Sequence, residues 1–403
     1  MSATAIPEHT VPDHVPEELV RDFDHYQSPQ PVEELFKYFS DAQINNPDVF
    51  YSPRNGGYWV VTRAALIREI MSAPSDFSSY PASIPAHGGR PPERRLAPVE
   101  LDPPIHKPFR AILAPLFSPA NMTAMEPKIR AKTIELIEAF KDKGSCEFVE
   151  EFASPLPTSI FLQIMGYPLE MREQFLEWNQ SLFRGETWEI KKAAGETIHK
   201  WLLSYVAERK TEAPRDDLLS LLINAEINGE KISDDMLMDA CYLLFIGGLD
   251  TVIQGLSYTF HYLAKYPEQR KRLLDDPSLI RSAVEEMQRV HSFVNTNRRV
   301  TNDLEFHGVK MKKDDMVLCS TAMVCCDPQY IEDFDVVRLD RKPNLHGAFG
   351  TGPHTCIGAP LARREIMIAL EEFLKRIPDF ELEAPGLASG GGVMGMHELK
   401  LKW

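Results

Sequence analysis

The sequence lacks a long uninterrupted apolar run, and this absence limits where the protein can work. A membrane-spanning helix needs about 20 consecutive apolar residues, so we expect no membrane span and no membrane partner. The first twenty residues, MSATAIPEHTVPDHVPEELV, are polar and acidic, and they lack the apolar segment of a secretory signal. We therefore expect a cytoplasmic protein.

Positive charge is also scarce in this chain. Lys and Arg total 44 against 59 Asp and Glu, so the formal net charge is −15. A strongly acidic protein is a poor partner for nucleic acids and anionic lipids, although a local basic patch can still bind another acidic protein. We expect no nucleic-acid partner.

Cysteines are few and scattered: the six form no Cys-x-x-Cys pair and no zinc-like spacing. In a reducing cytoplasm, five of them are expected to be small buried hydrophobic residues. The sixth, Cys356, lies in FGTGPHTCIG (349–358), where three glycines and a proline surround one thiol. The apolar residues of 357–377 have helical spacing, so Cys356 is predicted beside a helix N-terminus. Free N–H groups and the helix dipole favour a thiolate there, which predicts a loop that presents a sulfur anion.

No linker and no internal repeat divide the 403 residues. Residues 1–28 are predicted to form a flexible arm and residues 29–403 a single domain. Helical periodicity dominates 105–275, whereas 299–320 alternates like a small sheet and the glycine-rich tail predicts a terminal hairpin. The predicted fold class is mainly α with a minor β region.

Two further segments stand out before the helical region. Residues 56–63 (GGYWVVTR) predict a strand that is followed by a short helix. Residues 80–104 contain many prolines and little periodicity, which predicts a long loop. A loop of that length in a compact protein is usually functional and often a lid.

A long central helix is predicted from the N-cap Ser233 to about Lys265. It is apolar on nearly all sides and should be buried. Its centre, GGLDT (247–251), combines two glycines with an acid and an alcohol, all of which weaken a buried helix. Two interpretations stay open on this segment alone: a close helix crossing with a satisfied polar pair, or a groove with a proton-delivering pair, Asp250 and Thr251.

Glu286 and Arg289 are one helical turn apart and could form an i, i+3 ion pair. Such pairs are common, so a solvated surface pair is the default interpretation. Basic residues from three other segments are candidates for one anionic ligand. These are His106, Arg110, Arg298 and His354. An acidic ligand with a thiolate-binding centre describes haem.

Taken in order, the segments HxxxR, GGLDT, ExxR and FGxGxHxCxG resemble those of the cytochromes P450, and the cysteine loop is the most specific of them. The resemblance extends from about residue 28 onward. It is greatest to the bacterial camphor hydroxylase type, across LLFIGGLDTV, LEFHGVKM and LARREI. It implies a triangular prism of helices, with haem b between the long central helix and the helix after the cysteine loop, and dioxygen as the co-substrate.

The resemblance also implies a role for each residue of the cysteine side. Cys356 would be the metal ligand, the axial thiolate of the haem iron. Phe349 and Gly350 would shape the loop around the sulfur, and Glu286 with Arg289 would lock that loop without a chemical role. The haem propionates would be bound by His106, Arg110, Arg298 and His354.

On the opposite side, the resemblance assigns the central helix to oxygen and protons. Gly247 and Gly248 would open the helix beside the iron so that dioxygen fits. Thr251 would donate a hydrogen bond where dioxygen is reduced, and Asp250 would connect that place to solvent protons. The substrate pocket would be lined by Leu243, Ile246, Val294, Val393 and Met394.

The chain departs from the camphor enzyme at two places. Arg94 stands near the position of a substrate-anchoring tyrosine, and Thr296 replaces an aspartate that faces a propionate. The first departure argues against camphor itself. The aliphatic pocket residues favour a small apolar substrate, either a terpenoid or a norisoprenoid.

No dinucleotide-binding GxGxxG follows a strand in this sequence, so electrons are expected from a separate ferredoxin. A basic docking patch for it is predicted on the cysteine side, and a monomer is expected by resemblance. The candidate docking residues are Arg68, Lys107, Arg110 and Arg363.

Two rival functions remain on the same fold. One is a peroxygenase that takes hydrogen peroxide and needs no reductase. The other is a non-catalytic haem-thiolate sensor or ligand carrier. Neither needs the Asp250–Thr251 pair, so this pair favours the monooxygenase.

Overall fold

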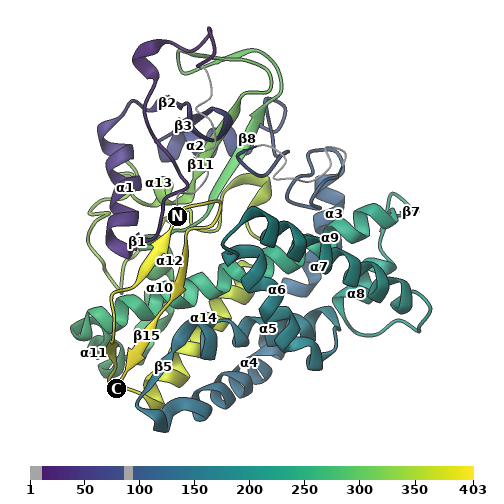
Figure 1. Ribbon diagram of the computed structural model, residues 1–403, viewed down its shortest axis with the longest axis vertical. Helices are drawn as coiled ribbons and strands as arrows, with labels where there is room; N and C mark the ends of the chain where they lie inside the picture. The colour runs from purple at the N-terminus through teal and green to yellow at the C-terminus, as the bar shows by residue number, and fades with distance from the viewer. Residues whose placement is uncertain (1–10, 86–93) are drawn as a thin grey trace.

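The computed structural model describes residues 11–85 and 94–403 and shows a mainly helical protein with small sheets (Figure 1). The predicted fold class is confirmed. The helices of the first half are α1 (Val32–Asn45), α2 (Ala64–Ser72), α3 (His106–Leu113), α4 (Pro119–Phe140), α5 (Pro155–Met165), α6 (Arg172–Arg184) and α7 (Trp188–Arg209). Those of the second half are α8 (Leu218–Ile223), α9 (Asp234–Gly248), α10 (Asp250–Lys265), α11 (Pro267–Asp275), α12 (Ile280–Val290), α13 (Thr321–Cys325) and α14 (Ala359–Arg376).

The largest sheet has the order β2-β3-β11-β8-β4 and lies at the top of Figure 1. It confirms the predicted strand at 56–63 and the predicted sheet in 299–320. β11 pairs parallel to β3 and antiparallel to β8, which brings Arg298 opposite Val317. Its strands are β2 (Val49–Ser52), β3 (Tyr58–Val61), β11 (Met316–Ser320), β8 (Asn295–Val300) and β4 (Phe77–Ser78).

Smaller sheets tie the ends of the chain to its middle. The predicted terminal hairpin is present as the antiparallel pair β13–β14. The remaining strands are β1 (Gln30–Pro31), β13 (Leu387–Ser389) and β14 (Gly395–Glu398) in one sheet, β12 (Glu381–Leu382), β15 (Lys400–Lys402) and β5 (Ser145–Glu147) in another, and the hairpins β9 (Leu304–Phe306) with β10 (Val309–Met311) and β6 (Glu226–Ile227) with β7 (Glu230–Lys231).

The predicted N-terminal arm is described from Val11 on, and this part is anchored. Val15 and Phe23 are buried in the core, and Val20 forms a bridge to Tyr51 of β2. Apolar side chains at positions 15 and 23 therefore hold residues 11–28 against the sheet, which differs from the predicted flexible arm. In the 80–104 loop, residues 86–93 lie outside the described residues, and the flanking parts form turns and bends.

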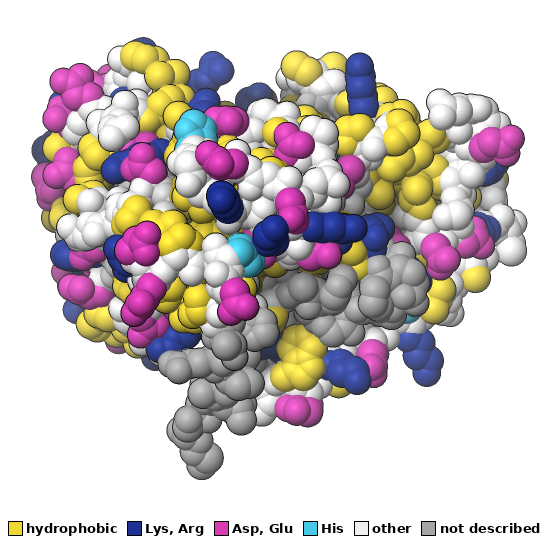
Figure 2. Space-filling view, turned by 90° about the horizontal axis from the view of Figure 1, so that it is seen from above, with side chains coloured by type: hydrophobic (Ala, Val, Ile, Leu, Met, Phe, Trp, Pro, Cys, Tyr) yellow, Lys and Arg dark blue, Asp and Glu magenta, His cyan; other side chains and the backbone are white. Residues whose placement is uncertain are grey.

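Figure 2 shows the face of the molecule at the β2–β3 end. Lys, Arg, Asp and Glu side chains are interspersed over it, with hydrophobic side chains between them. The acidic excess of the chain is therefore not gathered into one block on this face, and mixed signs are typical of a water-exposed surface.

The predicted central helix forms, with a break that the sequence placed in its GGLDT segment. Ser233 caps it by accepting a hydrogen bond from the Met236 N–H (3.2 Å). The backbone departs from regular geometry at Leu249 (φ −101°, ψ −68°), which separates α9 from α10. By length and composition alone this stretch could cross a membrane, but 56% of its most apolar window is buried and α10 packs against α12 and α14.

The apolar core has two parts that meet at this break. One is built around α10, α12, α14 and the sheets, and the other around α5 to α9. Phe245 of α9 belongs to the second part and Val252 of α10 to the first. The helix break thus lies at the boundary between the two parts of the core. A cavity at this boundary does not interrupt the packing within either part.

Buried histidines predict that acid weakens this fold. Burial lowers the pKa of His25 to about 3 and that of His291 to about 3, whereas an unfolded histidine titrates near about 6.5. Between these values the unfolded chain binds more protons than the folded chain. The free energy of unfolding should therefore fall as the pH drops, by up to about 1.4 kcal/mol per pH unit for each histidine.

The variant His25→Gln tests this directly, because glutamine can keep the hydrogen bond that the His25 Nδ1 shares with the Tyr58 hydroxyl (3.0 Å). Urea unfolding of the holoprotein between neutral pH and about pH 5 should show a shallower loss of stability in the variant. An unchanged slope in His25→Gln would contradict the assignment.

Candidate active site

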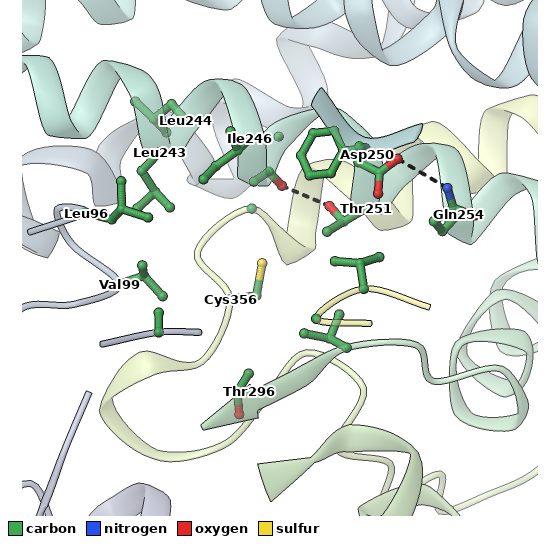
Figure 3. Close-up of a pocket in the computed structure, with 18 of the residues that line it drawn as sticks. Leu96, Val99, Leu243, Leu244, Ile246, Asp250, Thr251, Gln254, Thr296 and Cys356 are labelled. Carbon is green, nitrogen blue, oxygen red and sulfur yellow. Dashed lines mark hydrogen bonds between the residues drawn. The ribbon is translucent and has the colours of Figure 1, made fainter. Parts of the chain in front are cut away.

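A cavity of about 1340 Å³ lies between the helix break and the cysteine loop. Figure 3 shows Leu243 and Ile246 of α9 on one side, Cys356 facing them, and Leu96 with Val99 from the proline-rich loop. Predicted site residues from five separate segments of the chain line this cavity together. They are Arg110, Leu243, Ile246, Gly247, Gly248, Asp250, Thr251, Val294, Arg298, Phe349, Gly350, His354, Cys356 and Val393.

The backbone conformation of the cysteine loop depends on its glycines. Gly350 (φ +74°) and Gly352 (φ +71°) adopt left-handed conformations, and a Cβ on Gly352 would lie 2.8 Å from the carbonyl oxygen of Met71. The Cys356 N–H donates to the Phe349 carbonyl (2.8 Å) and closes the loop. These constraints direct Cys356 into the cavity, so that its side chain is open to the cavity although protein atoms surround it closely.

Two effects act on the Cys356 thiol in opposite directions, and the predicted effect of the loop N–H groups is one of them. Burial raises the pKa of the Cys356 thiol above its ordinary value, although the N–H groups of Gly358 and Ala359 and the Arg110 guanidinium oppose this effect. Desolvation outweighs the loop dipoles that the prediction considered. A bound cation at the sulfur would supply what the loop lacks, since metal coordination deprotonates a thiol.

Four predicted basic residues converge beside the cysteine loop. The ring of His106 stacks on that of His354 at 3.9 Å, and the Arg110 Nη2 donates to the Thr355 carbonyl (2.7 Å). Arg298 of β8 is buried and donates to its neighbour's carbonyl. His106 does not itself line the cavity but lies behind His354, and its Nε2 is buried without a partner.

This cluster is adapted to an acidic ligand. Burial, together with the positive charge of Arg298, lowers the pKa of His354 to about 3. Burial also lowers the pKa of Arg298, and burial followed by Arg110 lowers that of His106. The groups thus destabilise each other's positive charge, and an anion among them would reverse this effect. An exposed thiol, a glycine-lined cradle and basic side chains without enough acid fit haem b, whose propionates are anionic.

The GGLDT segment forms a groove at Gly247, and it also contains the satisfied polar group that the other interpretation expected. A Cβ on Gly247 would meet no described atom within 4 Å, so a close helix crossing does not explain that glycine. The Thr251 hydroxyl donates to the Gly247 carbonyl (2.9 Å), as a break in the helix ladder allows (Figure 3). Gly248 is tighter, since its Cβ would lie 3.4 Å from Phe161.

Asp250 is buried but paired. Its Oδ1 accepts hydrogen bonds from the Arg184 Nη2 (3.2 Å) and from the Gln254 Nε2 (3.2 Å). The Gln254 Oε1 in turn accepts from the Met396 N–H (2.7 Å), which connects α10 to β14. No sequence signal links Arg184 to Asp250, which lie far apart in the chain, so sequence reasoning missed this partner.

The default interpretation of Glu286 and Arg289 as a solvated pair is wrong, because both side chains are fully buried. The Arg289 Nη2 donates to the Glu286 Oε1 (2.8 Å), and Arg289 also donates to the carbonyls of Phe334 and Val336. Glu286 accepts from the Asn344 side chain (3.0 Å). Buried charges need such complete hydrogen bonding. Here it fixes the segment 334–344 that leads into the cysteine loop.

The neighbouring residue Glu285 supports the loop from the other side, and sequence reasoning missed it. It accepts hydrogen bonds from the Arg363 Nε (2.7 Å) and the His346 Nε2 (2.8 Å). Burial opposes ionisation of Glu285, but these two partners outweigh it and lower its pKa to about 2. Arg363 lies over the ring of Phe349, 4.3 Å from its centroid, so Glu285 positions the aromatic ring beside Cys356.

The substrate side of the cavity is mostly apolar, with one correction to the predicted lining. Val294 and Val393 line it, and they form a bridge between the residue that precedes β8 and the turn before β14. Met394 does not line it: its side chain is fully buried in the core. Side chains alternate in extended backbone, so Val393 and Met394 face opposite ways. Thr296 lines the cavity, and its hydroxyl donates to the Cys319 carbonyl (3.0 Å).

Arg94, which the sequence placed near a substrate-anchoring position, forms an ion pair. Its guanidinium donates to both carboxylate oxygens of Asp239 on α9, at 2.7 and 3.1 Å, and approaches Asp235 (3.3 Å). A two-pronged Arg–carboxylate contact is among the strongest side-chain pairs. It joins the proline-rich loop to the central helix over the cavity.

Comparison with known proteins agrees with this geometry. The model of the family described as cytochrome P450 matches residues 171–387. A probable cytochrome P450 127A1 from Sinorhizobium fredii is 35% identical, with 98% of this chain and 97% of the relative covered. A steroid C26-monooxygenase from Mycobacterium tuberculosis is 34% identical, with 77% of this chain and 86% of the relative covered.

Solved structures show the same similarity. The crystal structure of CYP101J2 has a TM-score of 0.88 and 34% sequence identity, and the match covers 98% of this chain and 99% of that one. The structure of CYP101C1 has a TM-score of 0.88 and 31% identity, with 98% and 100% covered. The chain therefore belongs to the cytochrome P450 family, close to the bacterial CYP101 type. It is a monooxygenase that uses haem b and dioxygen, as predicted.

Loss of the Glu286 charge should destabilise the protein and its haem site together. In Glu286→Gln, Arg289 stays buried with an incomplete set of acceptors, which typically costs about 3–5 kcal/mol of unfolding free energy. Urea unfolding and the haem content of the purified protein measure the two effects. The matched control is Asp275→Asn, which breaks an exposed i, i+4 pair with Lys271 and should change little. Equal stability of both variants would contradict the role given to the buried pair.

Proposed function

We propose that this P450 hydroxylates a small apolar substrate of the terpenoid or norisoprenoid class, with electrons from a separate ferredoxin. The observation that carries the proposal is the position of two motifs on opposite sides of one apolar cavity. The cysteine loop faces the break between α9 and α10, which places Cys356 across from Thr251 (Figure 3). The aliphatic lining of Leu243, Ile246 and Val294 suits an apolar carbon skeleton.

In this proposal Cys356 is the iron ligand, and the residues around it hold the cofactor. Arg110, Arg298 and His354 bind the propionates, with His106 supporting His354 from behind. Phe349 keeps water from the sulfur, and Gly350 lets the backbone approach it. Haem b, when bound, supplies the redox chemistry that places one oxygen atom of dioxygen on the substrate and releases the other as water.

In the same proposal, Thr251 and Asp250 deliver the protons that this reaction consumes. The Thr251 hydroxyl lies in the cavity and can turn from the Gly247 carbonyl to donate to a ligand in the groove. Asp250 exchanges protons with solvent when its hydrogen bond to Arg184 opens. Both hydrogen bonds that Asp250 accepts from the side chains of Arg184 and Gln254 end on Oδ1, which leaves Oδ2 to carry a proton. An acid next to an alcohol can thus pass protons one at a time to the place where they are needed.

The electron donor would bind on the cysteine side of the molecule. Lys107 is exposed there, and Arg68, Arg110 and Arg363 are partly exposed. Arg363 and Arg110 both lie beside the loop that carries Cys356. An acidic ferredoxin is the partner that such cations attract at low ionic strength. We also propose that the protein is a cytoplasmic monomer.

The rival functions lose support at the same residues. A peroxygenase takes its oxygen already reduced, so it does not need Thr251 and Asp250 joined to a helix break. A sensor needs a signal output and no proton supply. The Thr251–Gly247 and Asp250–Arg184 contacts therefore favour use of dioxygen over both rivals.

Replacement of Thr251 by alanine should separate electron consumption from product formation. With a ferredoxin, its reductase and a terpenoid substrate, the parent enzyme should convert most of the electrons that it consumes into a product labelled from ¹⁸O₂. In Thr251→Ala, we expect electron consumption to continue, product to fall about tenfold or more, and hydrogen peroxide to be released.

The matched control is Thr259→Ala on the same helix, where the hydroxyl makes the same kind of bond to the Gly255 carbonyl (2.6 Å) but does not line the cavity. It should stay coupled. Label incorporation that is the same in Thr251→Ala and the parent enzyme would overturn the role of Thr251. Turnover of the parent with peroxide alone, but not with ferredoxin, would favour the peroxygenase.

A further inference from the structure

Nearly every cation that lines the cavity has an evident counter-charge or a place in the haem site. Arg110 and Arg298 belong to the cluster beside the cysteine loop. The ion pairs at the cavity are Arg94 with Asp239 (2.7 Å), Arg184 with Asp250 (3.2 Å) and Lys192 with Glu196 (3.9 Å). Among the described residues that line the cavity, Lys191 is the cation that remains.

Lys191 lies on the face of α7 that is turned toward the cavity. Trp188, Lys191, Gly195 and His199 line the cavity at helical spacing, so they share this face. Lys191 is half-buried, and burial alone lowers its pKa, with no acidic group acting on it. A half-buried ammonium group without a carboxylate is destabilised unless a ligand supplies the negative charge.

The surroundings of Lys191 strengthen this requirement. The Arg184 Nε is buried without a hydrogen-bond partner. His397 of β14 lines the same cavity, and its Nε2 lies 2.7 Å from the Ser389 hydroxyl. Burial, Arg184 and Lys191 lower the pKa of His397, and the single acid that opposes them is Asp250. Three basic side chains from α6, α7 and β14 therefore lie at one end of the cavity, and the described carboxylates that line this end, Asp250 and Glu196, are paired with Arg184 and Lys192.

We propose that Lys191 binds the carboxylate of the substrate, so that the substrates of this enzyme are small apolar monocarboxylic acids. One uncompensated cation matches one negative charge, and a dianion such as a phosphate monoester would be left with excess charge. The apolar part of the acid lies against the aliphatic residues of α9. This inference rests on the proposed function, in which the cavity is the substrate pocket, and narrows the terpenoid class to its acids.

The test compares an acid and an alcohol with the same skeleton, perillic acid and perillyl alcohol, on the holoenzyme. Calorimetry gives the dissociation constants, and the shift of the Soret band on titration reports whether the ligand reaches the haem. The variants are Lys191→Met, which removes the charge at similar length, and Lys191→Arg, which keeps it. The matched control is Lys200→Met, an exposed lysine of α7 that does not line the cavity.

The parent enzyme should bind the acid more tightly than the alcohol. Lys191→Met should weaken the acid about tenfold, as expected for loss of a hydrogen bond to a charged group, and leave the alcohol unchanged. Lys191→Arg and Lys200→Met should keep the preference for the acid. Wild-type protein that binds the acid no more tightly than the alcohol, or equal weakening by Lys191→Met and Lys200→Met, overturns the inference.

The same measurements distinguish an error in the carboxylate site from an error in the proposed function. If the alcohol binds and shifts the Soret band while the acid shows no dependence on Lys191, the cavity is still a substrate pocket and the carboxylate site is wrong. If no ligand of either kind alters the haem spectrum and none is hydroxylated, the proposed substrate class itself is wrong, and the inference falls with it.

Discussion

The buried ion pair between Glu286 and Arg289 is the interaction on which the presentation of Cys356 depends. It satisfies carbonyl groups of the 334–344 segment that no regular element could satisfy, because this segment is neither helix nor strand. Glu285, one residue earlier, positions Phe349 through Arg363. Two consecutive acids of α12 therefore hold both ends of the path into the cysteine loop, although neither touches the cavity.

Opposite this loop, the central helix is interrupted between α9 and α10. A break at Leu249 costs backbone hydrogen bonds and places Asp250 in the interior, where an unpaired carboxylate would be costly. Arg184 and Gln254 offset that cost and connect the break to α6 and β14. β14 also carries His397 to the cavity, and α7, which follows α6 in the chain, carries Lys191 there. The polar groups at the break and the proposed carboxylate site thus belong to one network at the end of an otherwise aliphatic pocket.

Local patterns were enough to predict the fold class, the central helix with its N-cap, and the cysteine loop, because each depends on residues close together in the chain. The glycines of FGTGPHTCIG and GGLDT were informative because a left-handed turn and a helix groove need the absence of a Cβ. Long-range partners were not predictable: Arg94 with Asp239 and Arg184 with Asp250 have no spacing that links them. The burial of Glu286 and the inward turn of Met394 were misjudged, since each depends on what the rest of the chain packs around it. The desolvation that opposes the loop N–H groups at Cys356 was not predicted for the same reason.

The central claim is that Cys356 provides the thiolate ligand of the haem, and the visible spectrum of the ferrous carbon monoxide complex tests it most directly. The account predicts a strongly red-shifted Soret band in the parent protein and in Cys326→Ser, whose partly buried sulfur lies next to Gln43 instead. Cys356→Ser should lose that band. A band in the parent protein where histidine-ligated haem absorbs, or a red-shifted band that survives in Cys356→Ser, would contradict the account.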